Sequence, residues 1–509
     1  MQKRMLLLVL AAALLPGISL HAQNSQKPAG EAKPAQFAHM GEQTDGSFRK
    51  VVLVADKQVN GTQQDTLKDP MELAVAPDGR VFFVQRGGEL MVWEPAAKQE
   101  KLLGKLNVFT GLEDGLLGLT LDPKFADNGW IYLFYGAPET AYDRNGKRIG
   151  ENRVSRFTLT GEKLELASEK ILLRIETQRE QCCHSGGSLA FDSKGNLLAS
   201  TGDNTNPFHD HTQPNGRNGF APIDQRAGRA PWDAEKSSAN ANDLRGKILR
   251  IRPQPDGTYT IPPGNLFPPG TPDTRPEIYV MGNRNPFRIA LDRRNGFLYW
   301  GEVGPDAGAP SDNFGPAGFD EINQARKAGF FGWPYFVADN KPYFAFDYIS
   351  SEKGPLFDAA APHNRSPYNT GIRNLPPAQP AFIYYPHAPS SKFPVVNGPG
   401  GRTAMAGPVY YFDPKLKSAH KLPREFDHTL FIYEWSRNWV IAVKLDQRDQ
   451  IAGMERFCDK MTFRRPMDME LGPDGCLYMI EWGTAWSANL DTQIIRLEYT
   501  GSAPSLTKK

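Results

Sequence analysis

His184 and Asp203 are residues whose types and spacing could perform acid–base chemistry. Between them, an apolar stretch from Gly187, a turn around Asp192 to Gly195 and a second apolar stretch ending at Thr201 predict a β-hairpin. A hairpin returns its two ends to one edge of the sheet, so the imidazole and the carboxylate should meet there. A carboxylate fixes the ring tautomer and makes the other ring nitrogen a better base. The pair therefore predicts a general base, with a surface histidine beside a turn aspartate as the alternative.

The four cysteines add to this interpretation. Cys182 and Cys183 directly precede His184, and export would allow them to form a disulfide. We predict the pairs Cys182–Cys183 and Cys458–Cys476, because the first two residues are adjacent and the last two flank neighbouring strands. A ring closed between adjacent residues is strained, and strain of this kind gathers at functional sites.

The first residues and the composition of the chain predict a protein outside the cytoplasm. Residues 1–22 combine basic residues, a short apolar run and a small residue at Ala22, which predicts a cleaved signal peptide. Residues 23–47 are expected to be a flexible leader and 501–509 a C-terminal tail. The formal charge of +2 and the absence of a long apolar run predict neither a nucleic-acid partner nor a membrane span. We expect a periplasmic or secreted protein.

A repeated hairpin organises the rest of the chain. An apolar strand, a Pro/Asp/Gly turn and an aromatic-rich second strand recur six times, at 71–93, 116–135, 187–203, 287–303, 409–445 and 467–482. Such a repeat predicts an all-β fold, a six-bladed β-propeller over residues 48–500 with long loop insertions on one face. The insertions are expected at 204–245, 306–319 and 338–405, and the only helix near 321–327. The strand at 492–499 should pair with that at 48–55 and close the ring.

Residues at the ends of these hairpins should rise on one face around the central channel. They are Glu113, Asp114, His184, Asp203, Arg284, Asn285, Glu302, Gly304, Pro305, Arg402, Thr403, Glu434, Trp435, Arg464, Arg465, Asp468, Glu481 and Trp482. This set can bind anions, cations and planar or sugar rings. For each residue a structural role is the alternative: ion pairs between blades for the arginines, core packing for the tryptophans, and bonds to backbone N–H groups for the glutamates.

Several of these residues stand in motifs that resemble a known family. His184-x-Gly186-Gly187-x-Leu189, the run from Gly282 to Pro286, Gly304-Pro305, the run from Asp320 to Asn323, and Gly332-Trp333-Pro334 are similar to the soluble PQQ-dependent glucose/sorbosone dehydrogenases, which are six-bladed propellers. The resemblance implies an exported enzyme that oxidises an aldose at C1. It makes His184 the base, Asp203 its partner, and Arg284 with Asn285 the contacts to the quinone carbonyls.

The resemblance also implies the ligands of two cofactors. PQQ would lie among Glu113, Arg284, Asn285, Arg465 and Trp435, next to Cys182 and Cys183. Calcium would be held by the carbonyls of Gly304, Pro305 and Phe331 and by the carboxylate of Glu321. The chain departs from the family pattern at four positions. Glu113 and Phe287 stand where the family has glutamines, Ser436 stands where it has a lysine, and Met467 stands where it has an arginine. Two cationic partners for the PQQ carboxylates are thereby replaced.

Two other functions remain open from the sequence. The many carboxylates on the predicted face would suit a metal-dependent hydrolase or lyase acting on carbohydrate, and the aromatic and Asn-rich loops would suit a glycan-binding module. In each case the expected partner is a small-molecule sugar. A dehydrogenase would need a separate electron acceptor, because the chain contains no Cys-x-x-Cys-His haem motif. The oligomeric state is left open.

Overall fold

The computed structural model describes residues 39–143, 146–208 and 219–501. Within these residues six sheets repeat the predicted hairpin, and we number them as blades one to six in the order of their first strands. Blade one contains β5 (Pro70–Val75), β6 (Val81–Gln85), β7 (Glu89–Glu94) and β8 (Gln99–Lys105). Blade two contains β9 (Leu116–Leu121), β10 (Trp130–Gly136), β12 (Arg148–Thr160) and β13 (Lys163–Gln178), with β11 (Ala141–Tyr142) beside β12.

The next two blades carry the predicted site. Blade three contains β14 (Gly186–Phe191), β15 (Leu197–Thr201), β16 (Lys247–Pro253) and β18 (Ile278–Met281), extended by β17 (Tyr259–Thr260) and β22 (Gly329–Phe330). Blade four contains β19 (Pro286–Leu291), β20 (Leu298–Glu302), β21 (Phe319–Ala325) and β27 (Ile383–Pro386). The short helix expected near 321–327 is wrong, because this segment is the strand β21, paired with β20 and β27.

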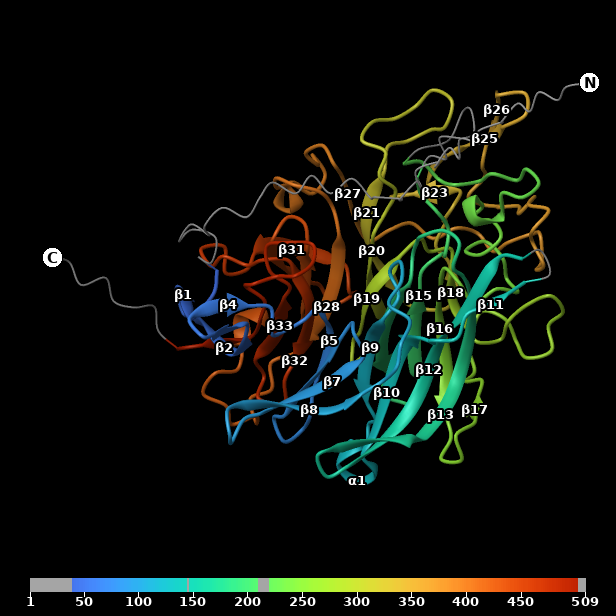
Figure 1. The fold of residues 1–509 in the computed structure, drawn as a ribbon. Coiled ribbons are helices and arrows are strands. Elements are labelled where there is room, and N and C mark those ends of the chain that lie inside the picture. Colours follow the sequence, from blue (N-terminus) through green and yellow to red (C-terminus); the bar gives the residue numbers. More distant parts are fainter. Residues whose placement is uncertain (1–38, 144–145, 209–218, 502–509) are drawn as a thin grey trace, which may run out of the picture. The chain divides into compact units, whose positions relative to one another are not determined.

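The last two blades close the ring. Blade five contains β28 (Ala404–Tyr410), β29 (Thr429–Glu434), β30 (Trp439–Leu445) and β31 (Ile451–Arg456). Blade six contains β32 (Pro466–Leu471), β33 (Leu477–Glu481), β34 (Gln493–Tyr499), β2 (Phe48–Ala55) and β1 (Gln43–Asp45). The predicted pairing of β2 with β34 is confirmed, and Figure 1 shows β1 and β2 in the same blade as β32 and β33, which come from the other end of the described chain.

Smaller elements occupy the connections. Three two-stranded ribbons are β3 (Lys57–Val59) with β4 (Thr62–Gln64), β23 (Phe336–Val337) with β24 (Lys341–Pro342), and β25 (Phe344–Asp347) with β26 (Glu352–Leu356). The helical elements are α1 (Phe125–Asn128) and 3-10 turns at Ala230–Trp232, Pro394–Val396 and Arg424–Phe426. The insertion expected at 338–405 is therefore only partly loop, since it contains β27, the fourth strand of blade four. No helix in the described part of the chain is long and apolar enough to cross a membrane.

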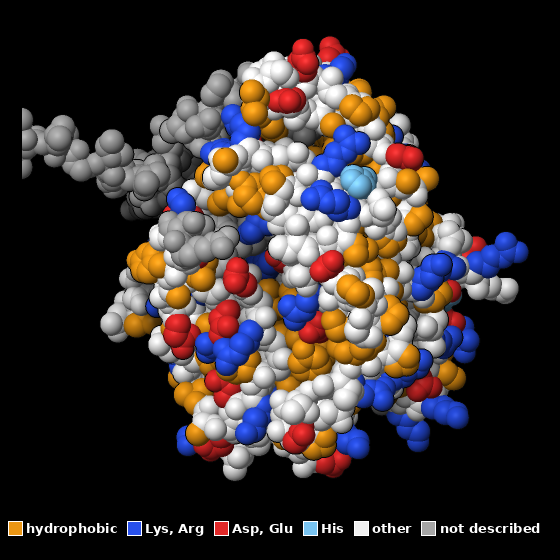
Figure 2. Space-filling model, turned by 90° about the vertical axis from the view of Figure 1, so that its right-hand side faces the viewer, with side chains coloured by type: hydrophobic (Ala, Val, Ile, Leu, Met, Phe, Trp, Pro, Cys, Tyr) orange, Lys and Arg blue, Asp and Glu red, His pale blue; other side chains and the backbone are white. Residues whose placement is uncertain are grey.

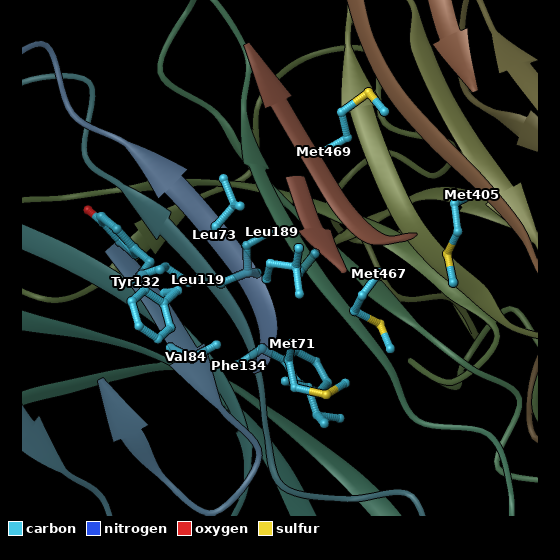
Figure 3. Close-up of a cluster of buried hydrophobic side chains, with 14 of the residues drawn as sticks. Met71, Leu73, Val84, Leu119, Tyr132, Phe134, Leu189, Met405, Met467 and Met469 are labelled. Carbon is cyan, nitrogen blue, oxygen red and sulfur yellow. The ribbon is translucent and has the colours of Figure 1, made fainter. Parts of the chain in front are cut away.

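Each blade is buried on both faces because it lies between two others. The second strands accordingly read as continuous apolar runs, such as Val81-Phe82-Phe83-Val84 in β6, all fully buried. The first strands β5, β9, β14, β19, β28 and β32 contact one another in sequence and back to β5. Figure 3 shows Leu73, Leu119 and Leu189 side by side on three of them. The interior of the ring is thus filled by side chains.

A buried ionic network joins these first strands at the centre of the ring. The carboxylate of Glu72 accepts hydrogen bonds from the Leu119 amide at 2.6 Å and from the Ser188 hydroxyl at 2.5 Å. The guanidinium of Arg288 lies 3.5 Å from Asp468, which in turn accepts from the Leu73 amide at 2.7 Å. The positive charge of Arg288 thus stabilises the carboxylates of both Glu72 and Asp468. Burial raises the pKa of Glu72 to about 8 and that of Asp468 to about 6.

Two predictions about the chain ends and cysteines need correction. The predicted leader, 23–47, is too long, because the chain is packed from His39 onward. The His39 ring is buried and hydrogen-bonded to the Asp491 carbonyl, and β1 pairs with β2. The predictions for residues 1–38 and 502–509 lie outside the described residues. Cys458 and Cys476 are both free and buried. Cys458 follows β31, on the side of blade five where β29 ends at Glu434. Cys476 lies in the turn before β33. The two residues therefore lie at opposite ends of their sheets.

The surface of the described chain carries both signs of charge. Figure 2 shows one side of it, on which Lys and Arg side chains are interspersed with Asp and Glu. This mixture agrees with the formal charge of +2.

Candidate active site

The predicted meeting of His184 and Asp203 is confirmed. The Nδ1 atom of His184 lies 2.8 Å from the Oδ1 of Asp203, and both side chains are buried. Asp203 is held in place by two further donors, the indole Nε1 of Trp333 at 3.0 Å and the amide of Thr205 at 3.1 Å. With Nδ1 of the imidazole on the carboxylate, its Nε2 is the atom left to take a proton.

The glycines after His184 make this geometry possible. Gly186 and Gly187 have φ angles of +70° and +116°, which side chains rarely allow. Between Gly186 and Leu189 the register of β14 on β15 shifts, so the strand bulges where it enters the sheet. A Cβ at Gly187 would also lie 2.8 Å from the Leu117 side chain of the next blade. The sequence His-Ser-Gly-Gly therefore lets the chain turn sharply and present the imidazole at the sheet edge.

A buried cation supports the backbone of His184. Arg245 donates through Nη2 to the His184 carbonyl, and its Nη1 lies 3.4 Å from the Thr177 hydroxyl. No carboxylate oxygen of the described residues lies within ion-pair distance of this guanidinium. Lys247, two positions on, donates to the carbonyls of Ser237 and Arg245, each at 2.7 Å. Burial lowers the pKa of Lys247 to about 7.

Arg284 and Asn285 lie beside the His184–Asp203 pair. The amide of Asp203 donates to the Arg284 carbonyl at 2.7 Å, so the two segments are joined through their backbones. The Arg284 guanidinium donates to the Val303 carbonyl at 2.8 Å and to Asp306 at 3.2 Å. The Asn285 amide donates to Glu302 at 2.8 Å, while its side-chain Oδ1 is buried without a hydrogen-bond partner.

All four predicted calcium residues line one small cavity. Its volume is about 10 Å³, the space of one water or ion, and its walls include Gly304, Pro305, Glu321 and Phe331. Glu302 and Asn323 also line it, and the Oδ1 of Asn323 is buried without a partner. Burial and the charge of Glu321 raise the pKa of Glu302 well above its ordinary value. Oxygen donors with two acids around a single-ion space suit a hard cation such as calcium.

One predicted ligand is partly engaged elsewhere. The Pro305 carbonyl accepts a hydrogen bond from the Arg402 guanidinium at 2.6 Å, and Arg402 also lies 3.3 Å from Asp320. The Glu321 carboxylate accepts from the Ala338 amide and, at 3.1 Å, from the Asn323 side chain. Burial raises the pKa of Glu321 to about 7.

A second pocket of about 620 Å³, which shares Arg284 with the small cavity, is lined by most of the other predicted residues. It is lined by Glu113, Cys183, His184, Arg284, Asn285, Arg402, Thr403, Trp435 and Trp482, and also by Phe287, Ser436 and Met467, so that all four departures from the family pattern face it. Cys182 and Cys183 are joined through their sulfur atoms in the structure. The exposed Glu113 accepts from the Ser185 amide at 3.2 Å. Arg465 does not line the pocket: its guanidinium stacks on the Trp435 ring at 4.1 Å.

The remaining carboxylates of the predicted face have structural partners. Glu481 pairs with the buried Lys50 at 3.0 Å, and Asp114 accepts from the Ser185 hydroxyl at 2.8 Å. Glu434 accepts from the amides of Thr403 and Arg437, and burial raises its pKa to about 8. Glu434 and Glu481 therefore offer no free acid to a hydrolase, whereas Glu113 lines the larger pocket and Glu302 the small cavity.

Sequence reasoning missed several residues of the pocket. They are Asp69, Met71, Arg86, Leu112, Ser185, Pro207, Phe208, Val303, Asp306, His387, Gly401, Met405, Trp486 and Ser487. His387 was missed because it follows β27, a strand assigned to a loop. Trp486 lies in the connection from β33 to β34, and its signal was a tryptophan in a polar segment at the edge that carries Glu481.

The polar and apolar residues that line the pocket suit PQQ. The unpartnered Oδ1 of Asn285 and Nε of Arg402 stand near the guanidinium of Arg284, and together they offer charge and hydrogen bonds to a carboxylated quinone. The indole nitrogens of Trp435 and Trp482, which line the same pocket, are also buried without partners. Met71, Phe287, Met405 and Met467 add an apolar surface for a planar ring.

Comparison with known proteins identifies the family of the chain. The model of the Glucose / Sorbosone dehydrogenase family matches residues 67–360, and the chain belongs to this family. It is 28% identical over 274 residues to aldose sugar dehydrogenase YliI of Escherichia coli, a match over 53% of this chain and 60% of that protein. It is 23% identical over 501 residues to quinoprotein glucose dehydrogenase B of Acinetobacter calcoaceticus, over 94% of each chain.

A solved structure shows the same fold. The PQQ-bound form of the aldose sugar dehydrogenase from Streptomyces coelicolor superposes with a TM-score of 0.53 at 18% identity, over 90% of this chain and 99% of that one. The six-bladed propeller predicted from the repeat is thereby confirmed, and the match to the family model confirms the family resemblance.

Proposed function

We propose that the protein is an exported quinoprotein that oxidises an aldose at its anomeric carbon, with PQQ as electron acceptor and calcium beside it. The observation that carries the proposal is the buried His184–Asp203–Trp333 chain, which opens with His184 into the pocket lined by Arg284 and Asn285. Membership of the Glucose / Sorbosone dehydrogenase family and the quinoprotein and PQQ-bound relatives support it.

The residues of the chain would have the following roles in catalysis and cofactor binding. Nε2 of His184 takes the proton of the C1 hydroxyl, while Asp203 keeps Nδ1 protonated and the ring fixed. Trp333 and Thr205 keep the Asp203 carboxylate from turning away. Arg284, Asn285 and Arg402 would hold PQQ, which when bound supplies the acceptor for the hydride of C1. Glu302, Glu321 and the carbonyls of Gly304 and Phe331 would hold calcium.

Reconstitution tests this function. Purified protein is incubated with PQQ and calcium, and a panel of aldoses is supplied with an artificial electron acceptor. We expect acceptor reduction that needs both additions and is lost in His184→Ala. Absence of turnover over the whole panel, or full activity of His184→Ala, would contradict the proposal.

Export is part of the same proposal. The predicted signal peptide, residues 1–22, and a disulfide between Cys182 and Cys183 both suit an oxidising compartment. Fractionation of cells that express the full chain, with mass spectrometry of the mature N-terminus, tests it. A protein that keeps residues 1–22 in the cytoplasmic fraction would contradict export. The physiological electron acceptor would be a separate molecule.

A further inference from the structure

A histidine and two aspartates from two blades converge at the end of the sheets away from the larger pocket. Asp292 lies in the turn between β19 and β20 of blade four, His428 directly precedes β29, and Asp449 lies in the turn between β30 and β31 of blade five. The other ends of these strands adjoin Asn285 and Trp435, which line the pocket. The three residues, which we call the inter-blade triad, are therefore separate from the candidate active site.

The triad presents one nitrogen and two oxygen atoms to a common centre. One ligand atom of each residue lies within 4.8 Å of the other two, and Nε2 of His428 is 2.8 Å from Oδ1 of Asp449. Two ligands of a tetrahedral zinc ion are roughly 3.4 Å apart at bond lengths of about 2.1 Å, so small side-chain movements would bring all three onto one ion. An imidazole among the ligands favours a transition metal over calcium, which takes oxygen ligands.

The two carboxylates of the triad carry negative charge that no nearby lysine or arginine neutralises. Within the described residues, no Lys or Arg nitrogen lies within 4.0 Å of the Asp292 or Asp449 carboxylate, and His428 is the one ion-pair partner of Asp449. Asp292 is 1% exposed, whereas the side chains of His428 and Asp449 are 23% and 16% exposed. A divalent cation would remove the repulsion between the acids, and the partial exposure gives it a route from solvent.

Neighbouring side chains hold the three ligands in place. The Tyr411 hydroxyl donates to Oδ2 of Asp292 at 2.7 Å, and the Tyr411 ring stacks on His428 with centroids 5.1 Å apart. The side-chain amide of Asn295 donates to Oδ1 of Asp449 at 3.1 Å. Outer contacts of this kind orient the ligands of protein metal sites.

A turn aspartate with a purely structural role has a different environment in blade three. Asp192 occupies the corresponding turn there, and its two oxygens accept from the Lys194 amide at 2.9 Å and from the Asn196 side chain at 2.7 Å, both within the turn. Oδ1 of Asp292 likewise accepts from an amide of its own turn at 2.8 Å. Its Oδ2 instead faces Tyr411 of blade five. Blade four thus directs a carboxylate oxygen towards its neighbour, where the histidine lies.

We propose that the inter-blade triad binds a divalent transition-metal ion such as zinc, and that this ion links blade four to blade five. Nε2 of His428 would bind through its lone pair, with the ring proton on Nδ1, and one oxygen of each aspartate would make three protein ligands. A water molecule would take the fourth position. Neither the binding nor its test depends on the proposed dehydrogenase function.

Calorimetric titration of the purified, chelator-treated protein with Zn²⁺ in excess calcium tests the site, and the visible absorption of bound Co²⁺ reports its ligands. We expect one zinc ion to bind, with a Kd at least about tenfold higher in His428→Asn and in Asp449→Asn. Asparagine tolerates the left-handed backbone at both positions, where φ is +58° and +56°. His363→Asn, which removes a histidine bonded to Asn374 outside the triad, is the matched control and should bind zinc like the wild type.

Thermal unfolding gives a second measurement that does not involve sugar turnover. Zinc should raise the Tm of the wild type and of His363→Asn but not that of His428→Asn, because the ion links two blades only in the folded state. Absence of zinc and cobalt binding to the wild type would overturn the proposal. Zinc binding that is unchanged in both triad variants, or that is lost in His184→Ala instead, would overturn it as well.

Discussion

The indole Nε1 of Trp333 donates a hydrogen bond to the Oδ2 of Asp203 at 3.0 Å, across 130 positions of sequence. The other carboxylate oxygen faces His184, so one aspartate joins the imidazole to the segment that follows blade three. The Trp333 ring therefore helps to orient the pair, and it lines the small cavity but not the larger pocket.

Replacing Asp203 by asparagine should abolish most of the activity. An amide cannot balance the imidazolium that forms when Nε2 takes the proton, and it allows the wrong tautomer. We expect kcat to fall by about 10²- to 10⁴-fold, which is the usual contribution of a general base to the rate. Trp333→Phe, which removes only the Oδ2 donor, should lose less. Equal kcat in Asp203→Asn and wild type would refute the assignment.

Calcium should stabilise the protein through the small cavity. Two buried acids face each other there, so a divalent cation relieves their repulsion as well as their burial. We expect the Tm of the wild type to rise with added calcium and fall with chelator. Glu321→Gln should lose most of this dependence, while the control Glu113→Gln should retain it. A chelator-insensitive Tm in the wild type would contradict a calcium site.

Stability should decline as the pH rises through the neutral range because of Glu72. Burial raises its folded pKa to about 8, above the unfolded value, so the folded state binds an extra proton between these two pKa values. The free energy of unfolding is then highest below the unfolded pKa and decreases up to pH 8. Urea unfolding at a series of pH values measures this. Glu72→Gln, which stays neutral, should flatten the slope, and an unchanged slope would show that other groups cause it.

Thiol alkylation should report one disulfide and two shielded cysteines. Burial raises the pKa of Cys458 well above its ordinary value and keeps Cys476 inaccessible. Without reductant, we expect iodoacetamide to modify no cysteine in the folded protein and two after unfolding in guanidinium, as counted by mass spectrometry. Four modified cysteines should appear only with reductant. If unfolding without reductant exposes none, Cys458 and Cys476 are bonded after all.

The repeat and the hairpin geometry made much of the fold and the central pair predictable. The alternation of apolar strands and turns can be recognised within a short stretch of sequence. The six blades and the contact between His184 and Asp203 could therefore be predicted from it. The strand β27 was missed because its short Ile383-Tyr384-Tyr385 run stands inside a polar insertion, and β21 was taken for a helix because its polar residues alternate only weakly. In both cases the pairing with a neighbouring strand decides the structure.

The partners of buried charges could not be predicted in the same way. Glu481 ends β33 and Asp468 lies within β32, but Lys50 and Arg288 reach them from distant parts of the chain. The same holds for Arg245, whose contact with the His184 carbonyl depends on how the insertion folds back over blade three. Such long-range contacts leave no local signal in one sequence.

The pairing of β2 with β34 has a consequence for how the molecule is made. Residues 48–55 are synthesised well before residues 493–499, the strand to which they are hydrogen-bonded. The ring therefore cannot close until β34 has been made, and β2 lacks this neighbour until then. Pairing between such distant segments forms slowly, and under the proposed export this delay would keep the chain open for transport.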